Sequence, residues 1–399
     1  MSGLPHQGAV GQVVLFHAGA IGDLLLSRGV LLALRQTLPQ ATWEAIGYPE
    51  RLLLLQDELR LARAASFDAA WVPRYLRDPA ACLDAPAALR QPGTLIVSFV
   101  DGIPPAGVPN PVVRLRVTPG PAALSPPRSS IERASRLPAE SSRGNEPRPP
   151  QQREAPQHVS SLLRQQLAAC GVVPNLAAAS AAGAGPATPP PLRFSTGARQ
   201  AASAWLRQRG IPGLAAGAIP DRPIVALHPG SGSVQKCWPV ERFALLAGWL
   251  RRQCGARLIV CLGPAETERL EPRQWNLAEA DILPAVAPPL DVLGALLRRC
   301  HLFIGNDSGI AHLAAAAGCP SVVLFGVTDW RIWRPLGSHV HCIAAEGEAP
   351  TTDWRGVDPA AARVIMERIP IDRVCELVAG LDRQLLAELW RERLLEDRL

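Results

Sequence analysis

Two stretches of the chain open with a short apolar run, a glycine-containing loop and an amphipathic helix, and this pattern most constrains the fold. The first stretch is VVLFHA (13–18), then GAIG (19–22) and DLLLSRGVLLALRQTLP (23–39). The second is IVALHPG (224–230), with the helical segment PVERFALLAGWLRRQCG at 239–255. Wholly apolar strands alternating with helices are typical of parallel sheets. The sequence therefore predicts an α/β protein with two Rossmann-like, doubly wound halves.

Other segments extend this pattern in both halves. In the first half we expect strands at ATWEAIG (41–47) and TLIVSFVDG (94–102), and a helix at RLLLLQDELRLARAA (51–65). In the second half, strands are expected at 257–263, 301–307 and 321–326, with helices at 291–300 and 308–318 and an amphipathic helix from Ile371. The short spacing between these segments is typical of doubly wound sheets.

Composition divides the chain into three parts. Residues 1–175 form the predicted first domain, in which 119–156 is rich in Pro, Ser, Arg and Glu and poor in large apolar residues. Such a segment buries too little apolar surface to offset its ordering entropy, so we interpret it as a disordered insertion. Residues 176–222 are the predicted linker and lead-in helix, and 223–399 the second domain.

Charge and cysteine usage exclude several classes of protein. The formal charge is +6 over 399 residues. The arginines are scattered and form no basic run interleaved with aromatic residues, so we expect no nucleic-acid partner. Nine cysteines without a C-x-x-C pair disfavour a disulfide framework and a structural zinc site. No signal-peptide pattern and no apolar stretch of about 18 residues is present, so we expect a cytoplasmic protein, with weak attraction to an anionic membrane surface left open.

The loop HPGSGSVQKCWP (228–239) has the composition of a phosphate-binding loop. It contains Lys236, the single lysine of the chain, whose point charge suits phosphate oxygens. Its glycines allow close backbone approach and its serines supply hydroxyl donors: Gly230, Gly232, Ser231 and Ser233. The structural alternative is a glycine-rich turn with a solvated lysine.

A second loop, GNDSGIAH (305–312), connects a predicted strand to a helix. The free N–H groups and positive dipole end of that helix, around Gly309, favour a diphosphate. Alternatively, Asp307 or Ser308 is simply the helix N-cap. His312 lies on the same helix face as Ser308, and by itself is more often a packed histidine than a ligand.

Carboxylates follow two other predicted strands. Asp23 comes after Gly19 and Gly22 at a helix N-terminus, where it is either a capping carboxylate or a base exposed to a cleft. Glu266, after the strand at 257–263, is a candidate acceptor for ribose hydroxyls or an ordinary surface residue.

Several alternatives remain weaker. The chain has no G-x-S-x-G elbow and no G-x-x-x-x-G-K-[ST] loop, which disfavours a serine hydrolase and a P-loop NTPase. A dinucleotide-binding site is a further interpretation, because Gly19 and Gly22 follow a strand and Glu44 lies where a ribose-binding acid would. However, His17 replaces the first glycine of the G-x-G-x-x-G motif. The histidines and cysteine at 339–342 fit alternating strand positions better than a metal site.

The quoted segments together resemble glycosyltransferase family 9, the ADP-heptose:lipopolysaccharide heptosyltransferases. The resemblance rests on GD after the first strand, on HPGSG…KxWP, and on GNDSGxxH before FGVTD. It implies a GT-B fold, in which two Rossmann-like domains face a cleft, with the donor nucleotide bound in the second domain and the acceptor in the first.

The resemblance also implies roles for residues. Asp23 would be the catalytic base and Lys236 would stabilise the leaving diphosphate, with Gly19 and Gly22 near the acceptor. The donor site would comprise Ser231, Gly232, Ser233, Glu266, Asp307, Ser308, Gly309, His312 and Thr328. The expected activity is inverting, metal-independent transfer of a sugar, heptose by resemblance, from a nucleotide donor to lipopolysaccharide or another surface glycan, with no cofactor and with peripheral contact at the inner membrane face. The alternatives are a catalytically degenerate sugar-nucleotide-binding protein and an NAD-dependent Rossmann enzyme.

Overall fold

A computed structural model describes residues 10–79, 81–105, 108, 110–117, 156–172, 188–211, 222–269, 281–347 and 354–381. All of the expected insertion except Pro156 lies outside the described residues, as do 176–187 and 212–221 of the expected linker. Among the described helices, none is both long and apolar enough to cross a membrane.

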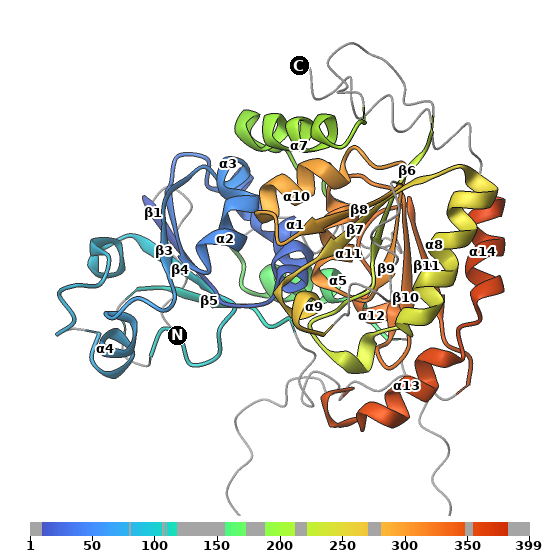
Figure 1. Ribbon diagram of the computed structural model, residues 1–399. Coiled ribbons are helices and arrows are strands. Elements are labelled where there is room, and N and C mark those ends of the chain that lie inside the picture. The colour runs from blue at the N-terminus through green and yellow to red at the C-terminus, as the bar shows by residue number, and fades with distance from the viewer. Residues whose placement is uncertain are drawn as a thin grey trace, which may run out of the picture.

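The first sheet has five parallel strands in the order β3-β2-β1-β4-β5 (Figure 1). Side chains of β1 alternate between its faces: Val13 and Leu15 pack toward the second half, whereas Val14 and Phe16 pack into a separate outer cluster. The strands are β1 Gln12–His17, β2 Thr42–Gly47, β3 Leu61–Ser66, β4 Thr94–Ser98 and β5 Val112–Arg114.

The second sheet has six parallel strands in the order β11-β10-β9-β6-β7-β8. When β6 is counted as strand 1 and the sheet is followed from β8 to β11, the order is 3-2-1-4-5-6, as in dinucleotide-binding sheets. The strands are β6 Ile224–His228, β7 Arg257–Leu262, β8 Ile282–Val286, β9 Leu302–Asn306, β10 Ser321–Phe325 and β11 Val340–Ala344. Both sheets are doubly wound, as the sequence predicts.

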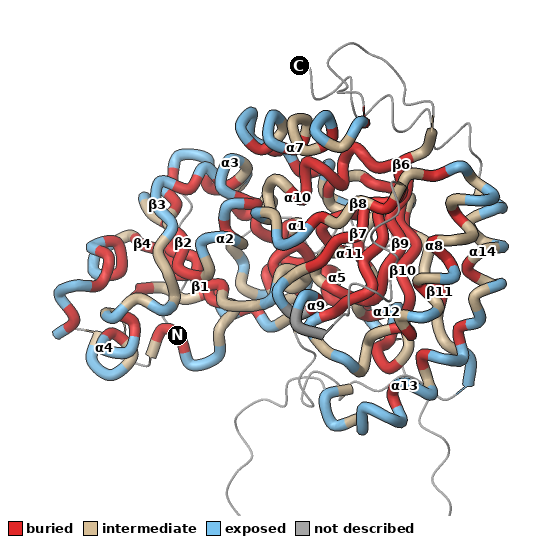
Figure 2. Tube along the Cα trace, viewed as in Figure 1, coloured by how far each residue is buried: buried red, intermediate tan, exposed pale blue. Residues whose placement is uncertain are grey.

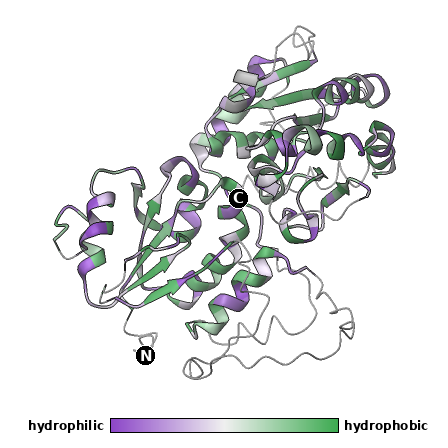
Figure 3. Ribbon diagram, turned by 90° about the horizontal axis from the view of Figure 1, so that it is seen from below, coloured by the Kyte–Doolittle hydropathy of each residue, from purple (hydrophilic) through white to green (hydrophobic). Residues whose placement is uncertain are grey.

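Helices lie between the sheets and on their outer faces (Figures 1 and 2). α1, α5, α10 and α11 form the layer between the sheets and contribute to one shared apolar core, while α8 and α14 cover the outer face of the second sheet. Seen from below, each lobe carries its apolar strands inside (Figure 3). The α-helices are α1 Ile21–Thr37, α2 Pro49–Leu52, α3 Gln56–Leu59, α4 Val72–Arg77, α5 Val159–Ala169, α7 Thr196–Gln208, α8 Val240–Cys254, α9 Pro264–Arg269, α10 Leu290–Leu297, α11 Gly309–Ala316, α12 Trp330–Trp333, α13 Pro359–Glu367 and α14 Ile371–Gly380. The short 3₁₀ turns are η2 Leu53–Leu55, η3 Ala87–Arg90, η5 Val234–Lys236 and η7 Trp354–Gly356.

The predicted helix at 51–65 is wrong in its second part. The helical turns end where Arg60 adopts a left-handed conformation, with φ of 49°. The following residues form β3, which pairs with β2 along the edge of the first sheet. The alanines in LARAAS favour a helix locally, but hydrogen bonding to the open edge of β2 overrides that propensity.

The strand orders determine where a ligand can bind. In each sheet the winding reverses between the first and fourth strands, between β1 and β4 and between β6 and β9. Open α/β sheets bind ligands beyond the carboxyl ends of the strands at such a point. Most of the site residues predicted from the sequence lie in three such loops, which follow β1, β6 and β9.

Candidate active site

A cleft of about 600 Å³ lies between the two halves at these strand ends. From the first half it is lined by the loop after β1, with Gly19, Gly22 and Asp23. From the second half it is lined by the predicted donor residues Ser231, Gly232, Ser233, Lys236, Asp307, Ser308, Gly309 and His312. The fold therefore brings eleven residues singled out in the sequence into one cavity.

The loop after β6 is fixed to the end of β9 by Asn306. The fully buried Asn306 amide donates from Nδ2 to the Pro229 and Gly230 carbonyls, at 2.7 and 3.2 Å, and its Oδ1 accepts from the Trp238 N–H at 3.0 Å. The Ser231 hydroxyl donates to the Asp307 carbonyl at 2.8 Å. These bonds hold both ends of the loop, so that η5 presents Lys236 to the cleft.

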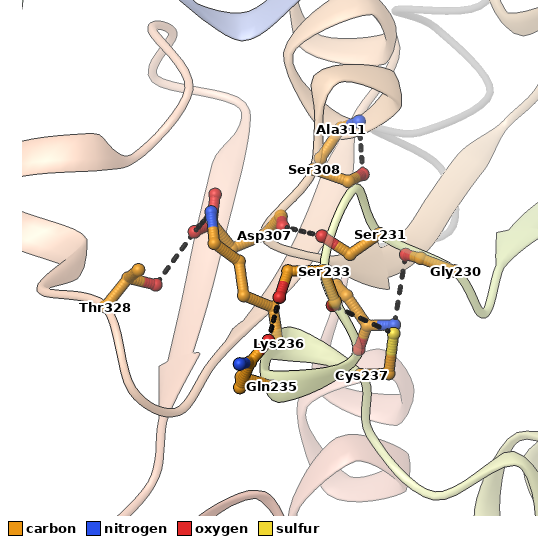
Figure 4. Close-up of polar contacts among 11 residues, drawn as sticks. Gly230, Ser231, Ser233, Gln235, Lys236, Cys237, Asp307, Ser308, Ala311 and Thr328 are labelled. Atoms are coloured by element: carbon orange, nitrogen blue, oxygen red, sulfur yellow. Dashed lines mark hydrogen bonds and ion pairs between the residues drawn. The ribbon is translucent and has the colours of Figure 1, made fainter. Parts of the chain in front are cut away.

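Lys236 is held by an ion pair. Its Nζ lies 2.9 Å from Asp307 Oδ2, and the same oxygen accepts a hydrogen bond from the Thr328 hydroxyl at 2.8 Å. Figure 4 shows these side chains with Ser231 around Asp307. Thr328 is buried behind the carboxylate and does not line the cleft. A carboxylate in this position repels phosphate oxygens, so its chemical role is to orient the lysine.

The amino terminus of α11 faces the same cleft. Ser308 is its N-cap: the hydroxyl accepts from the Ala311 N–H at 3.3 Å. A Cβ on Gly309 would lie 2.9 Å from the Cβ of Ile21, and one on Gly22 would lie 3.0 Å from the His312 ring, so glycines allow α1 and α11 to meet end to end. Burial lowers the pKa of His312 to about 4, which leaves its imidazole neutral near pH 7.

Asp23 occupies the third position of α1 and is both a cap and a cleft residue. Its Oδ2 accepts from the Ala20 N–H at 3.1 Å. Burial raises the pKa of the Asp23 carboxyl above its usual 3.8, against the opposing effects of the Ala20 N–H and of the positive charges on Lys236 and Arg355. A raised pKa makes this carboxylate a stronger base than an exposed aspartate.

Glu266 lies outside the main cleft. It lines an adjoining cavity of about 250 Å³, which shares Ser231 with the cleft. The side chain is buried, its Oε2 accepts from the Gly263 N–H at 2.8 Å, and its Oε1 lies where a Cβ on Gly230 would be. It is therefore not a surface residue, and its predicted contact with ribose stays a prediction.

Ten other residues line the cleft that the sequence analysis did not select as site residues, and seven of them carry an ionisable or aromatic side chain. These seven are His17, Phe99, Asp101, Arg116, Trp333, Trp354 and Arg355. His17 is buried, its pKa is lowered to about 4 by desolvation, and its Nε2 has no hydrogen-bond partner among the residues that the structure describes. Asp101 lies near the end of the predicted strand at 94–102, three residues after β4 ends, and pairs with Arg116 at 3.0 Å. Their position at the carboxyl ends of predicted strands would have indicated His17 and Asp101, whereas no sequence pattern marks Trp354 and Arg355.

The structure contradicts the ribose-binding role that the dinucleotide-binding alternative gives to Glu44. Glu44 lies within β2, and its Oε1 accepts from the Gln12 amide at 3.4 Å, at the end of β1 remote from Gly19 and Gly22. It cannot reach a ribose at the carboxyl edge of the sheet. In the 339–342 segment, His339 Nε2 bonds the Ala315 carbonyl at 3.0 Å, and the next residues form β11. Within the described ranges, no three potential metal ligands cluster together.

Comparisons with known proteins point to one family. Residues 174–358 match the model of Glycosyltransferase family 9 (heptosyltransferase). The chain is 31% identical over 138 residues to lipopolysaccharide heptosyltransferase 3 of Escherichia coli, which covers 33% of this chain and 40% of that protein. It is 33% identical over 135 residues to lipooligosaccharide heptosyltransferase 2 of Haemophilus influenzae, with 32% and 38% covered. These matches span about two fifths of the length of the curated relatives.

Solved structures share the fold over nearly the whole chain. A glycosyl transferase of family 9 from Veillonella parvula superposes with a TM-score of 0.64 at 15% identity, covering 95% of this chain and 98% of that one. The ADP-heptose lipopolysaccharide heptosyltransferase II of E. coli gives a TM-score of 0.54 at 17% identity, covering 92% and 100%. The two Rossmann-like domains facing a cleft thus form a GT-B fold. The match of residues 174–358 and the shared fold both point to glycosyltransferase family 9.

Proposed function

We propose that this protein is an inverting glycosyltransferase that moves heptose from ADP-heptose to a lipopolysaccharide or other cell-surface glycan acceptor. The observation that carries the proposal is the shared cleft. It places a carboxylate from the first half, Asp23, opposite a cation and a helix N-terminus from the second half, Lys236 and α11. The family match of residues 174–358 supports the same activity.

Asp23 is suited to remove the proton from an acceptor hydroxyl. As that proton moves to the carboxylate, the hydroxyl oxygen forms a bond to the anomeric carbon. The bond between that carbon and the diphosphate oxygen breaks, and its electron pair leaves with the diphosphate. Attack opposite to the leaving group inverts the anomeric centre. General base catalysis of this kind contributes roughly 10²–10⁴ in rate.

The second half supplies positive charge for the leaving group. Lys236 lies at the cleft wall with its ammonium directed by Asp307, and the free N–H groups of α11 begin beside it at Gly309. A preorganised donor of this type lowers the barrier by about 3–4 kcal/mol. We infer that these groups stabilise the diphosphate without a metal ion. The Ser308 hydroxyl accepts the cap bond and keeps its own hydrogen for a donor oxygen at the same wall, and Glu266 would face the ribose from the adjoining cavity. The hydroxyls of Ser231 and Ser233 donate to Asp307 and Gln235, so these serines would have to exchange those bonds to contact the donor.

The acceptor would enter from the first half. Its wall carries the loop at Gly19 and Gly22 and the Asp101–Arg116 pair. We infer a cytoplasmic enzyme that meets a lipid-linked or glycan acceptor at the inner membrane face, with no nucleic-acid partner. The net charge of +6 favours contact with an anionic surface.

A nucleotide panel tests the donor class. Thermal unfolding is measured with ADP, UDP, GDP, CMP and NAD for the wild type and for Lys236→Met. A ligand at about 100 times its Kd stabilises by about 2.7 kcal/mol. We expect ADP to give the largest shift and Lys236→Met to lose it, while the exposed control Arg77→Met keeps it. Stabilisation by NAD alone, equal in the wild type and Lys236→Met, would contradict the proposal.

A further inference from the structure

The turn η7 carries an aromatic ring that contacts two cations, and all three residues line the cleft. Lys236 Nζ lies 4.4 Å from the centre of the Trp354 ring, and the guanidinium carbon of Arg355 lies 4.6 Å from it. Both Trp354 and Arg355 line the cleft together with Lys236. Cations at such distances are attracted to the electron-rich face of an indole.

Trp354 completes the surroundings of the Lys236 ammonium. Asp307 holds that ammonium at 2.9 Å, and the lysine side chain is only 18% exposed. With the indole as a second partner, the long side chain loses most of its freedom to turn away from the cleft. The turn itself is tied to the lysine loop, because the Gln235 amide donates to the Val357 carbonyl at 3.4 Å and α13 packs against η5.

Arg355 carries a positive charge that the cleft leaves without an anion. Its side chain is exposed, and among the described residues no carboxylate lies within ion-pair distance of it. Arg355 lines the same cleft as Asp23, and its positive charge opposes the effect of burial, which raises the pKa of the Asp23 carboxyl. An arginine presents several N–H donors in a plane that matches two phosphate oxygens at once, whereas lysine offers a point charge.

We propose that Arg355 binds the diphosphate of the donor together with Lys236, and that Trp354 is a positioning residue that holds both cations toward it. This inference rests on the proposed function. Both cations contact the same ring and line the same cleft, so one anionic ligand bound there would lie near both of them. Trp354 acts through Lys236 and Arg355 and touches no reacting atom.

Calorimetric titration with ADP and AMP tests the proposal on the full-length protein. The variants are Arg355→Gln, Trp354→Leu and Trp354→Phe, with Arg77→Gln on α4 as a matched exposed control. We expect Arg355→Gln to weaken ADP binding about tenfold or more and AMP binding less, as the loss of a charged hydrogen bond to the outer phosphate implies. Trp354→Leu should weaken ADP binding by a similar factor, whereas Trp354→Phe, which keeps an aromatic face, should recover most of it.

The possible failures are distinguishable. If the wild type and Arg355→Gln bind ADP equally well, Arg355 does not bind the diphosphate, and the proposed function is unaffected. Equal losses in Trp354→Leu and Trp354→Phe would show that the ring has a packing role and overturn its role in positioning. A wild type that binds none of ADP, UDP and GDP overturns the proposed function itself. Since Arg355 is exposed, its substitution leaves folding unchanged, which thermal unfolding without ligand checks.

Discussion

Replacing Lys236 by methionine removes the counter-charge of Asp307 and keeps an unbranched side chain of similar length. In the wild type the ammonium lies 2.9 Å from the carboxylate, and the lysine and aspartate side chains are 18% and 6% exposed. After the substitution the carboxylate keeps the Thr328 hydroxyl as a donor, at 2.8 Å, but has lost its cation. In Lys236→Met the nearly buried carboxylate of Asp307 therefore has lost its ionic partner.

The size of the effect follows from that burial. Removing one partner of a buried ion pair costs about 3–5 kcal/mol of folding free energy. Because Lys236 is partly exposed and one hydrogen bond to Asp307 remains, we expect the low end, about 3 kcal/mol. In the double variant Lys236→Met/Asp307→Asn both charges are gone and an amide oxygen still accepts from Thr328. We expect it to recover about 2 kcal/mol of the loss.

Two measurements on the same variants separate stability from binding. Urea unfolding followed by circular dichroism gives the folding free energies, and calorimetry gives the affinity for ADP. We expect the double variant to regain stability while both variants stay deficient in ADP binding, because neither has the ammonium. A Lys236→Met variant as stable as the wild type, or a double variant no more stable than the single one, would contradict a stabilising ion pair. Recovery of ADP affinity in the double variant would contradict a binding role for the ammonium.

Three further outcomes follow from the site. Burial lowers the pKa of His17 and of His312 from 6.5 to about 4, so the unfolded chain binds more protons than the native protein between these values. The free energy of unfolding should therefore decrease on acidification from pH 7 to pH 5, by about 2 kcal/mol for each histidine. Chemical unfolding at the two pH values measures this decrease, and equal free energies of unfolding would contradict it. Because the pKa of Asp23 is raised above 3.8, transfer should fall with decreasing pH along an acid limb whose midpoint lies above 3.8, and a kcat profile with its midpoint at or below that value would count against Asp23 as the base. Prior treatment with EDTA should leave the initial rate of transfer unchanged, whereas a loss that Mg²⁺ restores would refute a diphosphate site built from protein groups alone.

Local sequence was sufficient to predict the central part of the site. Asp23, Lys236 and Ser308 each come after a mostly apolar, buried strand, and parallel strands bring their carboxyl ends to one edge of a sheet. The reversal of strand order next to β1 and β6 then places these loops at the crevice of each half. Such features depend on residues close together in the chain, which is why the pattern shows them.

Long-range packing determined what the sequence did not show. Trp354 reaches the cleft from a short turn far along the chain from Lys236, and nothing in its neighbouring residues marks it. Asp307 belongs to the predicted loop, but only the structure shows that its carboxylate faces Lys236 and Thr328. Likewise β3 forms because β2 offers an open edge, whereas the residues of β3 favour a helix.

The most direct test of the proposed glycosyltransferase is to measure sugar transfer by a variant in which the carboxylate of Asp23 is replaced by a neutral amide. Wild type, Asp23→Asn and the exposed control Asp68→Asn are incubated with ADP-heptose and heptose-deficient lipopolysaccharide acceptors, and ADP release and glycosylated product are quantified. We expect transfer by the wild type and by Asp68→Asn, and a loss of at least a hundredfold in Asp23→Asn with ADP affinity nearly unchanged. Undiminished turnover in Asp23→Asn would remove that residue from the mechanism, and tight ADP binding by a wild type that transfers to no acceptor would contradict a glycosyltransferase activity.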